Sequence, residues 1–176
     1  EHMQFLAESI RKYNLQHVHF TTGQCLQMHG LDGDTILNLF KECHEHGIYN
    51  RGAGGDNPNV VASILRGIDP RETLDITPYA AAISEFLMEQ MFYFKLPRKF
   101  KMAIDNGFDS TPHTTFKDLG FNLTKYNTFD VYACGGLGPN PRMGIPVAHD
   151  VQPEDVLYYV KAMLMVFANQ IGRAHV

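Results

Sequence analysis

The chain has 176 residues, of which 44% are apolar and 19% charged, and its formal net charge is −4. This length allows one or two compact domains with a substantial core, and the composition is typical of a soluble globular protein. The negative net charge argues against nucleic-acid binding, which normally needs a basic excess. The longest strongly apolar run, residues 162–168, is too short to cross a bilayer, and no signal peptide is visible. We therefore expect no nucleic-acid or membrane partner.

The first 50 residues predict two helices and two strands. Residues 3–13 have helical spacing, and residues 17–21 and 25–30 read as extended segments. A helix is predicted to start at Asp34 and to end before Gly47, with an acidic residue near its positive end. Its apolar stripe consists of Ile36, Leu39, Phe40 and Cys43. We interpret this unit as a strand–helix–strand arrangement.

Residues 51–58 (RGAGGDNP) predict a boundary, because Gly, Asn and Pro punctuate structural elements. The following unit contains a helix with Thr77 at its cap and Pro78 at its first position, and strands at 99–105 and 129–133. A long terminal helix is expected after residues 153–155. Its buried face is predicted to comprise Val156, Leu157, Val160, Leu164, Phe167, Ala168 and Ile171. The pattern favours an α/β or α+β fold, with an antiparallel or mixed sheet covered by helices.

The segment 96–101 (LPRKFK) places cations next to a predicted strand. Since successive strand side chains alternate, Lys99 and Lys101 should share one face, while Arg98 and Phe100 take the other. Two neighbouring ammonium groups repel each other unless an anion lies between them. The alternative is a solvated edge strand, in which lysines discourage aggregation.

Cysteine and histidine spacing bears on metal binding. The three cysteines, Cys25, Cys43 and Cys134, form no C-x-x-C pair, which excludes a recognisable zinc ribbon or local cluster motif and suits a reducing cytoplasm. His17 and His19 are spaced as an H-x-H pair, which can bind zinc or nickel. A metal site there would need a third ligand nearby, so it is kept only as an alternative and no metal site is predicted.

Five segments in order resemble the sulfite/nitrite reductase family, whose members carry siroheme coupled to a 4Fe–4S cluster. They are residues 21–30 (TTGQCLQMHG), 74–78 (LDITP), 96–101 (LPRKFK), 116–121 (FKDLGF) and 135–138 (GGLG). The resemblance runs from about residue 17 to residue 173 and implies an α+β chain. Residues 1–50 would be a ferredoxin-like half-domain, residues 51–58 a Gly-rich boundary, and residues 59–176 the first helix–sheet repeat of a longer protein.

The same resemblance implies roles for single residues. Lys99 and Lys101 match the paired catalytic lysines that face siroheme and substrate. Gln27 matches the glutamine of a T-x-R-Q-x-x-Q segment that contacts the tetrapyrrole, and Asn57 falls in a G-D-N stretch near the ring. Asn59 and Arg142 complete the set of expected cofactor-binding residues, Arg142 because it could reach a carboxylate.

Three positions depart from the family pattern. Gly23, His19 and Asn59 stand where relatives place arginines, and neither Gly nor Asn can replace a permanently charged guanidinium fork. The chain is thus predicted to be the N-terminal part of a reductase that converts sulfite to sulfide or nitrite to ammonia with an electron donor. The alternative is a non-catalytic relative that binds a tetrapyrrole or a protein. The cluster ligands would lie in the missing C-terminal half, so this fragment is expected to hold neither cofactor.

Overall fold

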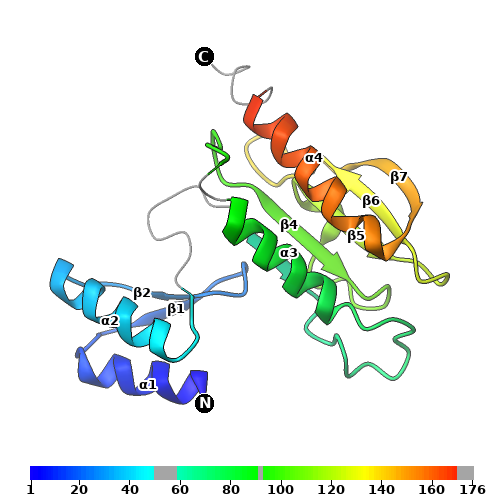
Figure 1. Cartoon of the computed structure of the whole chain (residues 1–176). Coiled ribbons are helices and arrows are strands. Elements are labelled where there is room, and N and C mark those ends of the chain that lie inside the picture. The colour runs from blue at the N-terminus through cyan, green and yellow to red at the C-terminus, as the bar shows by residue number, and fades with distance from the viewer. Residues whose placement is uncertain (50–58, 91–92, 170–176) are drawn as a thin grey trace. The chain divides into compact units, whose positions relative to one another are not determined.

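The computed structural model describes residues 1–49, 59–90 and 93–169. The chain divides into two compact units, Glu1–Ala53 and Gly54–Val176. The first unit contains a small hairpin with two helices, and the second a five-stranded sheet with two longer helices (Figure 1). None of the described helices is long and apolar enough to cross a membrane.

In the first unit, a helix comes before and after a two-stranded antiparallel hairpin. The strands follow each other directly, so the expected strand–helix–strand order is wrong: the tight turn in which Thr21 N–H donates to Cys25 O (2.9 Å) leaves no room for a helix. The second helix begins at Gly33, and its cap is Asp32, whose carboxylate accepts from Thr35 N–H at 2.8 Å. The elements are α1 (His2–Lys12), β1 (Val18–Phe20), β2 (Leu26–Met28) and α2 (Gly33–Glu45).

The first unit has a small interior. Of the predicted stripe on α2, Leu39 and Cys43 are buried, whereas Phe40 is exposed. Glu42 joins the two helices by accepting from Lys12 Nζ at 2.5 Å and from the Tyr13 hydroxyl at 2.7 Å. A unit this small buries little apolar surface, so its helices depend on such contacts as well as on the core.

The sheet of the second unit is mixed, which is one of the two predicted arrangements. Its order is β3-β4-β5-β6-β7, in which β3, β4 and β5 run parallel and the β5–β6 and β6–β7 pairs are antiparallel. The prediction for 129–133 is confirmed, but three of the strands were not predicted from the sequence, because they are short or contain Gly, Asn or Pro. The strands are β3 (Asn59–Ala62), β4 (Lys101–Asp105), β5 (Leu119–Leu123), β6 (Phe129–Ala133) and β7 (Ile145–Val151).

Two helices, α3 (Thr77–Gln90) and α4 (Val156–Asn169), lie over one face of this sheet (Figure 1). A short 3-10 helix, η2 (Pro153–Asp155), leads into α4, and another, η1 (Thr114–Phe116), precedes β5. The predicted face of α4 is largely confirmed, although Ile171 lies outside the described residues. Its fully buried members are Val156, Val160, Leu164 and Phe167, which pack in a core with Ile83, Leu87, Phe121 and Phe129.

Strand β4 is an interior strand of the sheet. It pairs with β3 on one side and with β5 on the other, so the solvated-edge alternative is wrong. It also begins at Lys101, two residues later than predicted, and residues 102–105 are all buried. The period-two pattern fails after Lys101 because both faces of this central strand are covered.

Candidate functional site: a cationic edge of the sheet

Charged residues gather where the parallel strands begin. The amino ends of β3, β4 and β5 meet at one edge of the sheet. Asn59, the first residue of β3, is the register partner of Lys101, the first residue of β4. Because Met102 pairs with Leu119, the preceding residue Asp118 lies beside Lys101. We call Arg98, Lys101, Lys117 and Asp118 the cationic edge, since it holds three cations and one carboxylate.

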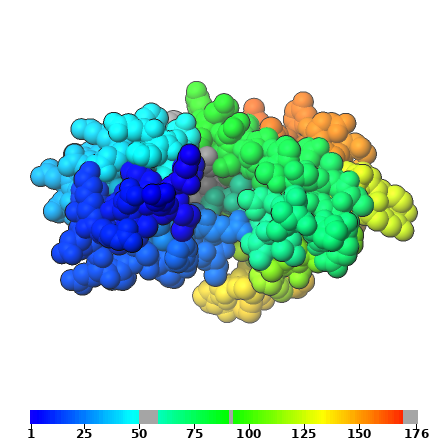
Figure 2. All heavy atoms as spheres, turned by 90° about the horizontal axis from the view of Figure 1, so that it is seen from below, coloured from blue at the N-terminus to red at the C-terminus, as the bar shows by residue number. Residues whose placement is uncertain are grey.

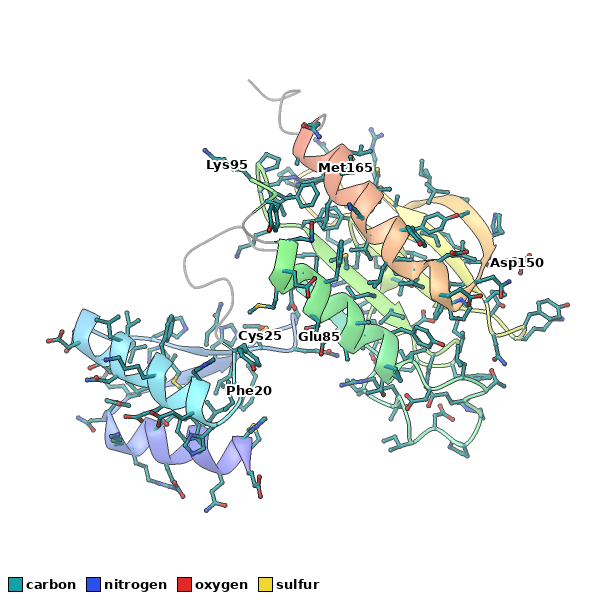
Figure 3. All side chains as sticks on the ribbon, viewed as in Figure 1. Phe20, Cys25, Glu85, Lys95, Asp150 and Met165 are labelled. Atoms are coloured by element: carbon teal, nitrogen blue, oxygen red, sulfur yellow. The ribbon has the colours of Figure 1, made fainter. Side chains whose placement is uncertain are left out.

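The segment leading into β4 is anchored by an aromatic contact. Phe100 is 1% exposed, and its ring centroid lies 4.8 Å from that of Phe167 on α4 in an edge-to-face arrangement. The Arg98 guanidinium lies 5.5 Å from the same ring. Lys99 and Lys101 are both exposed, while Lys95 points away from the unit (Figure 3). Buried Phe100 therefore fixes the backbone from which the neighbouring lysines project.

Asp118 ties the cations together. Its Oδ2 accepts from the Lys101 backbone N–H at 2.8 Å, and its Oδ1 lies 3.6 Å from Arg98 Nη2. Burial raises the pKa of the Asp118 carboxyl, an effect opposed by the Lys101 N–H and by the charges of Arg98 and Lys101. One partly shielded carboxylate thus faces an excess of positive charge.

Lys117 is half-buried next to this carboxylate. Burial lowers the pKa of its ammonium, and the positive charge of Lys101 lowers it further, whereas Asp118 acts in the opposite direction. Among the described residues, neither Lys101 nor Lys117 has a carboxylate within ion-pair distance. Sequence reasoning singled out the segment 116–121 but missed Lys117 and Asp118 as site residues. A Lys-Asp pair directly before an apolar run could have indicated charged residues at the start of a strand.

The loop between β6 and β7 is fastened to the same edge. Gly135 N–H donates to Lys117 O at 2.9 Å, and a Cβ at Gly135 would lie only 2.8 Å from that oxygen. Arg142 and Gly136 exchange backbone hydrogen bonds of 2.9 Å, which closes the loop on itself. The exposed loop stands out in gold in Figure 2. The base of the Arg142 loop therefore lies against Lys117.

The structure brings some predicted residues together and leaves others apart. Asn59, Lys101 and the loop of Arg142 share the edge, with exposed Lys99 just before β4. Gln27 is exposed on β2 of the first unit, opposite His19. Asn57 lies outside the described residues. The cofactor and substrate roles assigned to these residues stay predictions.

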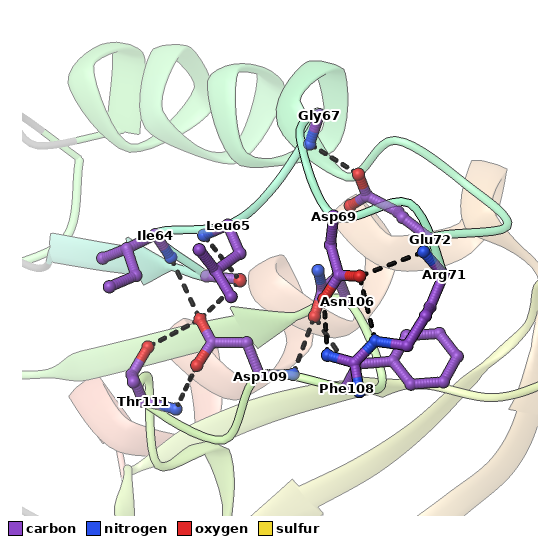
Figure 4. Close-up of polar contacts among 11 residues, drawn as sticks. Ile64, Leu65, Gly67, Asp69, Arg71, Glu72, Asn106, Phe108, Asp109 and Thr111 are labelled. Carbon is purple, nitrogen blue, oxygen red and sulfur yellow. Dashed lines mark hydrogen bonds and ion pairs between the residues drawn. The ribbon is translucent and has the colours of Figure 1, made fainter.

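The carboxyl ends of the parallel strands carry polar chemistry of a different kind (Figure 4). Buried Asp109 accepts from the Ser63 hydroxyl at 2.6 Å, from Ile64 N–H at 3.2 Å, and from both the N–H and the hydroxyl of Thr111 at 3.0 and 2.7 Å. Burial alone would raise the pKa of Asp109, but these hydrogen bonds lower it. With its carboxylate oxygens engaged by the protein, this group has the features of a structural network.

A salt bridge and a second buried carboxyl group lie in the same part of the unit (Figure 4). Arg71 donates from Nε and Nη2 to the two oxygens of Asp69 at 3.0 and 2.8 Å, which lowers the pKa of Asp69 to about 2. Asp105 accepts from Gly107 N–H at 2.9 Å and from Leu123 N–H at 3.2 Å. Burial nevertheless raises the pKa of Asp105.

The described residues offer no metal centre. They contain no group of three or more His, Cys, Asp or Glu side chains that could hold an ion. His17 stacks on His29 with ring centroids 5.2 Å apart, so the H-x-H pair of His17 and His19 finds no third ligand in the described part of the chain. By contrast, the ammonium and guanidinium groups of the cationic edge are donors suited to an anion, such as an oxyanion or a carboxylate.

The comparison with protein families covers both units. Residues 53–175 match the model of the nitrite and sulphite reductase 4Fe-4S domain, and residues 1–46 match that of the nitrite/sulfite reductase ferredoxin-like half domain. A solved structure of the Mycobacterium tuberculosis NirA protein superposes with a TM-score of 0.78 at 22% identity, over 96% of this chain and 31% of that chain. This likeness shows the fold, and the expected α+β class with a ferredoxin-like half-domain is confirmed.

Curated relatives are reductases of nitrite or sulfite. The chloroplastic ferredoxin–nitrite reductase of Spinacia oleracea is 29% identical over 96% of this chain and 30% of its own length. A ferredoxin–nitrite reductase of Synechococcus elongatus is 30% identical, over 79% of this chain and 27% of its own length. A ferredoxin sulfite reductase of Mycolicibacterium paratuberculosis is 26% identical, over 85% of this chain and 27% of its own length. The chain thus spans about a third or less of these relatives, and it belongs to the nitrite and sulfite reductase family.

Proposed function

We propose that this chain is the N-terminal part of a siroheme-dependent nitrite or sulfite reductase, in which its cationic edge binds anionic groups of substrate and cofactor. The observation that carries the proposal is the excess of positive charge at the amino ends of β4 and β5, where one carboxylate serves three cations. It lies within the residues that match the reductase family. The proposed compartment is the cytoplasm, which suits three scattered cysteines.

The chemistry of the edge suits siroheme, a tetrapyrrole whose rim carries carboxylates. Lys101 and Lys117 offer ammonium donors, and Arg98 adds a guanidinium already held at Asp118. Siroheme, when bound, supplies the redox chemistry. The described residues do not suit a 4Fe–4S cluster, because they contain no group of three or more candidate ligands. By resemblance, the cluster ligands belong to a second copy of the repeat, in the missing C-terminal half.

The residues of this chain have two tasks in the proposed reaction. Exposed Lys99 and Lys101 attract the substrate anion and stabilise negative charge as the reduction proceeds. Reduction of nitrite or sulfite also consumes protons, and a lysine ammonium can deliver one. Phe100 holds the lysine-bearing segment against α4, so both ammonium groups start from a fixed backbone. Electrons come from a separate donor, and the ferredoxin in the relatives' names suggests its class.

The test uses the protein that contains these residues and continues past Val176. Sequencing beyond that point should reveal four suitably spaced cysteines. The purified protein should show siroheme absorption and should oxidise reduced methyl viologen when nitrite or sulfite is added. A protein without chromophore, cysteines or turnover would contradict the proposal.

A second function, a non-catalytic relative that binds a tetrapyrrole or a protein, has one observation in its favour. Gly23, His19 and Asn59 stand at positions where the family resemblance expects arginines, so part of the anion-binding charge is missing. In this case the protein would bind a tetrapyrrole or a partner protein without turnover. The same purification distinguishes the two functions, because only the reductase needs the cluster cysteines.

A further inference from the structure

Three histidines lie on one face of the β1–β2 hairpin. His19 pairs with Gln27 in the register of the two strands, so His17 stands opposite His29, one pair beyond the last pair of the ladder. Directly paired residues, and residues two apart in one strand, point to the same face of a sheet. His17, His19 and His29 therefore share a face, and all three are exposed.

The rings of His17 and His29 are in contact across the hairpin. Their centroids lie 5.2 Å apart and their planes differ by 19°, which is a stacked arrangement. A ring nitrogen of His46, by contrast, is engaged by the protein, since its Nδ1 lies 2.9 Å from the carbonyl oxygen of Glu42. In the described part of the chain, the ring nitrogens of His17 and His29 take part in no hydrogen bond or ion pair.

Two neighbouring imidazoles with available nitrogens are ligands for a first-row transition metal. Imidazole suits Zn²⁺, Ni²⁺ and Cu²⁺, whereas Mg²⁺ and Ca²⁺ prefer oxygen ligands. Because both side chains are exposed, their rings can turn out of the stack and direct one nitrogen each to the same ion. The described residues form no group of three or more candidate ligands, so this pair makes an open chelate, completed by water, and not a closed centre.

We propose that His17 and His29 chelate a divalent transition metal, with Zn²⁺ as the test ion, and thereby fasten β1 to β2. The cross-strand pair takes the place of the H-x-H pair that the sequence suggested. A small folding unit commonly needs a metal, a disulfide or a partner in addition to its core. In this unit the thiols of Cys25 and Cys43 are free, so no disulfide supplies that support. The proposal is independent of the proposed function, which assigns neither histidine a role.

A zinc titration of the 176-residue chain tests the proposal. Wild type, His17→Gln, His29→Gln and His19→Gln are titrated with zinc chloride at pH 7.5, and the imidazole resonances of each histidine are followed by NMR, so that zinc bound elsewhere is recognised. Because the second bond of a chelate forms within one molecule, loss of either paired imidazole should weaken binding by at least about tenfold. His19→Gln is the matched control and should bind zinc as wild type does.

A double variant separates a chelate from two independent ligands. Once one imidazole is gone the other no longer chelates, so His17→Gln combined with His29→Gln should bind no more weakly than either single variant. Magnesium chloride should give no saturable shift at either ring. Additive losses, an equal loss in His19→Gln, or no saturable zinc shift at His17 and His29 in wild type would overturn the inference.

Thermal unfolding adds a readout of the fastening itself. An ion that binds the folded hairpin stabilises it by mass action, so saturating zinc should raise the unfolding midpoint of β1 and β2 in wild type and in His19→Gln. In His17→Gln and His29→Gln the midpoint should stay where it is without zinc. Zinc binding at both rings with no rise in the wild-type midpoint would show that the ion does not join the strands, and the inference would fail.

Discussion

The two ends of the parallel strands β3, β4 and β5 differ in how their charges are satisfied. At the carboxyl ends, Asp109 is buried and receives four hydrogen bonds from protein groups, and Asp69 is paired with Arg71. At the amino ends, three cations share Asp118, and the ammonium groups of Lys101 and Lys117 have no ion-pair partner among the described residues. Polar groups satisfied by their own protein stabilise a fold, whereas cations without an ion-pair partner are suited to bind an anion from outside the chain.

The largest expected effect concerns the anchor of the amino-end segment. Phe100→Ala should lower the free energy of unfolding by about 3–5 kcal/mol, because it removes a buried ring packed on Phe167. Urea unfolding of the 176-residue chain measures this loss. Phe108→Ala is the control: this residue is 49% exposed, so the loss should be much smaller. Equal losses would show that Phe100 is not the anchor.

The second effect separates activity from stability at the cationic edge. In the longer reductase, Lys99→Ala and Lys101→Ala should each lower turnover by about 10²–10³, as expected for groups that stabilise developing negative charge. Because both side chains are exposed, the free energy of unfolding should change by no more than about 0.5 kcal/mol. Steady-state turnover and thermal unfolding are compared with Lys125→Ala. Full activity in both lysine variants would remove them from the site.

The third effect concerns the carboxyl ends, where we expect a loss of stability without a loss of anion binding. Asp109→Ala should destabilise the second unit by at least about 1–3 kcal/mol, the cost of leaving one buried donor such as the Ser63 hydroxyl unpaired. Anion affinity of the remaining folded protein should stay the same. Ser110→Ala, at an exposed neighbour, serves as the control in chemical unfolding. A stable Asp109 variant with altered anion binding would contradict the division between the two ends.

The smallest effect is a pH dependence from Asp105. Because the fold raises the pKa of this carboxyl, the folded state protonates first as pH falls, and wild type gains stability down to the unfolded-state pKa. Asp105→Asn keeps an Oδ1 acceptor for Gly107 and Leu123 and has no charge to bury. The variant should be at least as stable as wild type at pH 7, with an advantage that shrinks towards pH 4. Urea midpoints across that range check the sign, and an advantage that grows with acidity would contradict it.

The sequence predicted the elements with strong local patterns. The strand at 129–133 and the buried face of α4 follow from apolar spacing, and a sheet covered by helices follows from the order of the elements, although an antiparallel and a mixed sheet were both left open. It did not predict that β4 lies inside the sheet, and a solvated edge strand stood as the alternative to a binding role for Lys99 and Lys101. The lysines are exposed only because they sit where the strand begins. Burial of residues 102–105 depends on neighbours distant in sequence, which a period-two pattern cannot indicate.

The candidate site was predicted only in part, for a similar reason. Lys101 and Asn59 are far apart in sequence, and the resemblance to the family named both, but their register pairing comes from the parallel sheet. Lys117 and Asp118 were recognised as site residues only from the register of β5 with β4 and from the Gly135 contact. Both involve residues distant in sequence. The sequence identifies candidate cations, but the pairing of the strands determines which of them are neighbours.

Residue-resolved NMR of the 176-residue chain during a sulfite titration tests the contrast between the two ends most directly. The account predicts saturable shifts of backbone resonances at Lys101, Lys117 and Gly135, while those of Ser63, Asp109 and Thr111 stay in place. Saturable shifts at the carboxyl ends, with none at the amino ends, would contradict it.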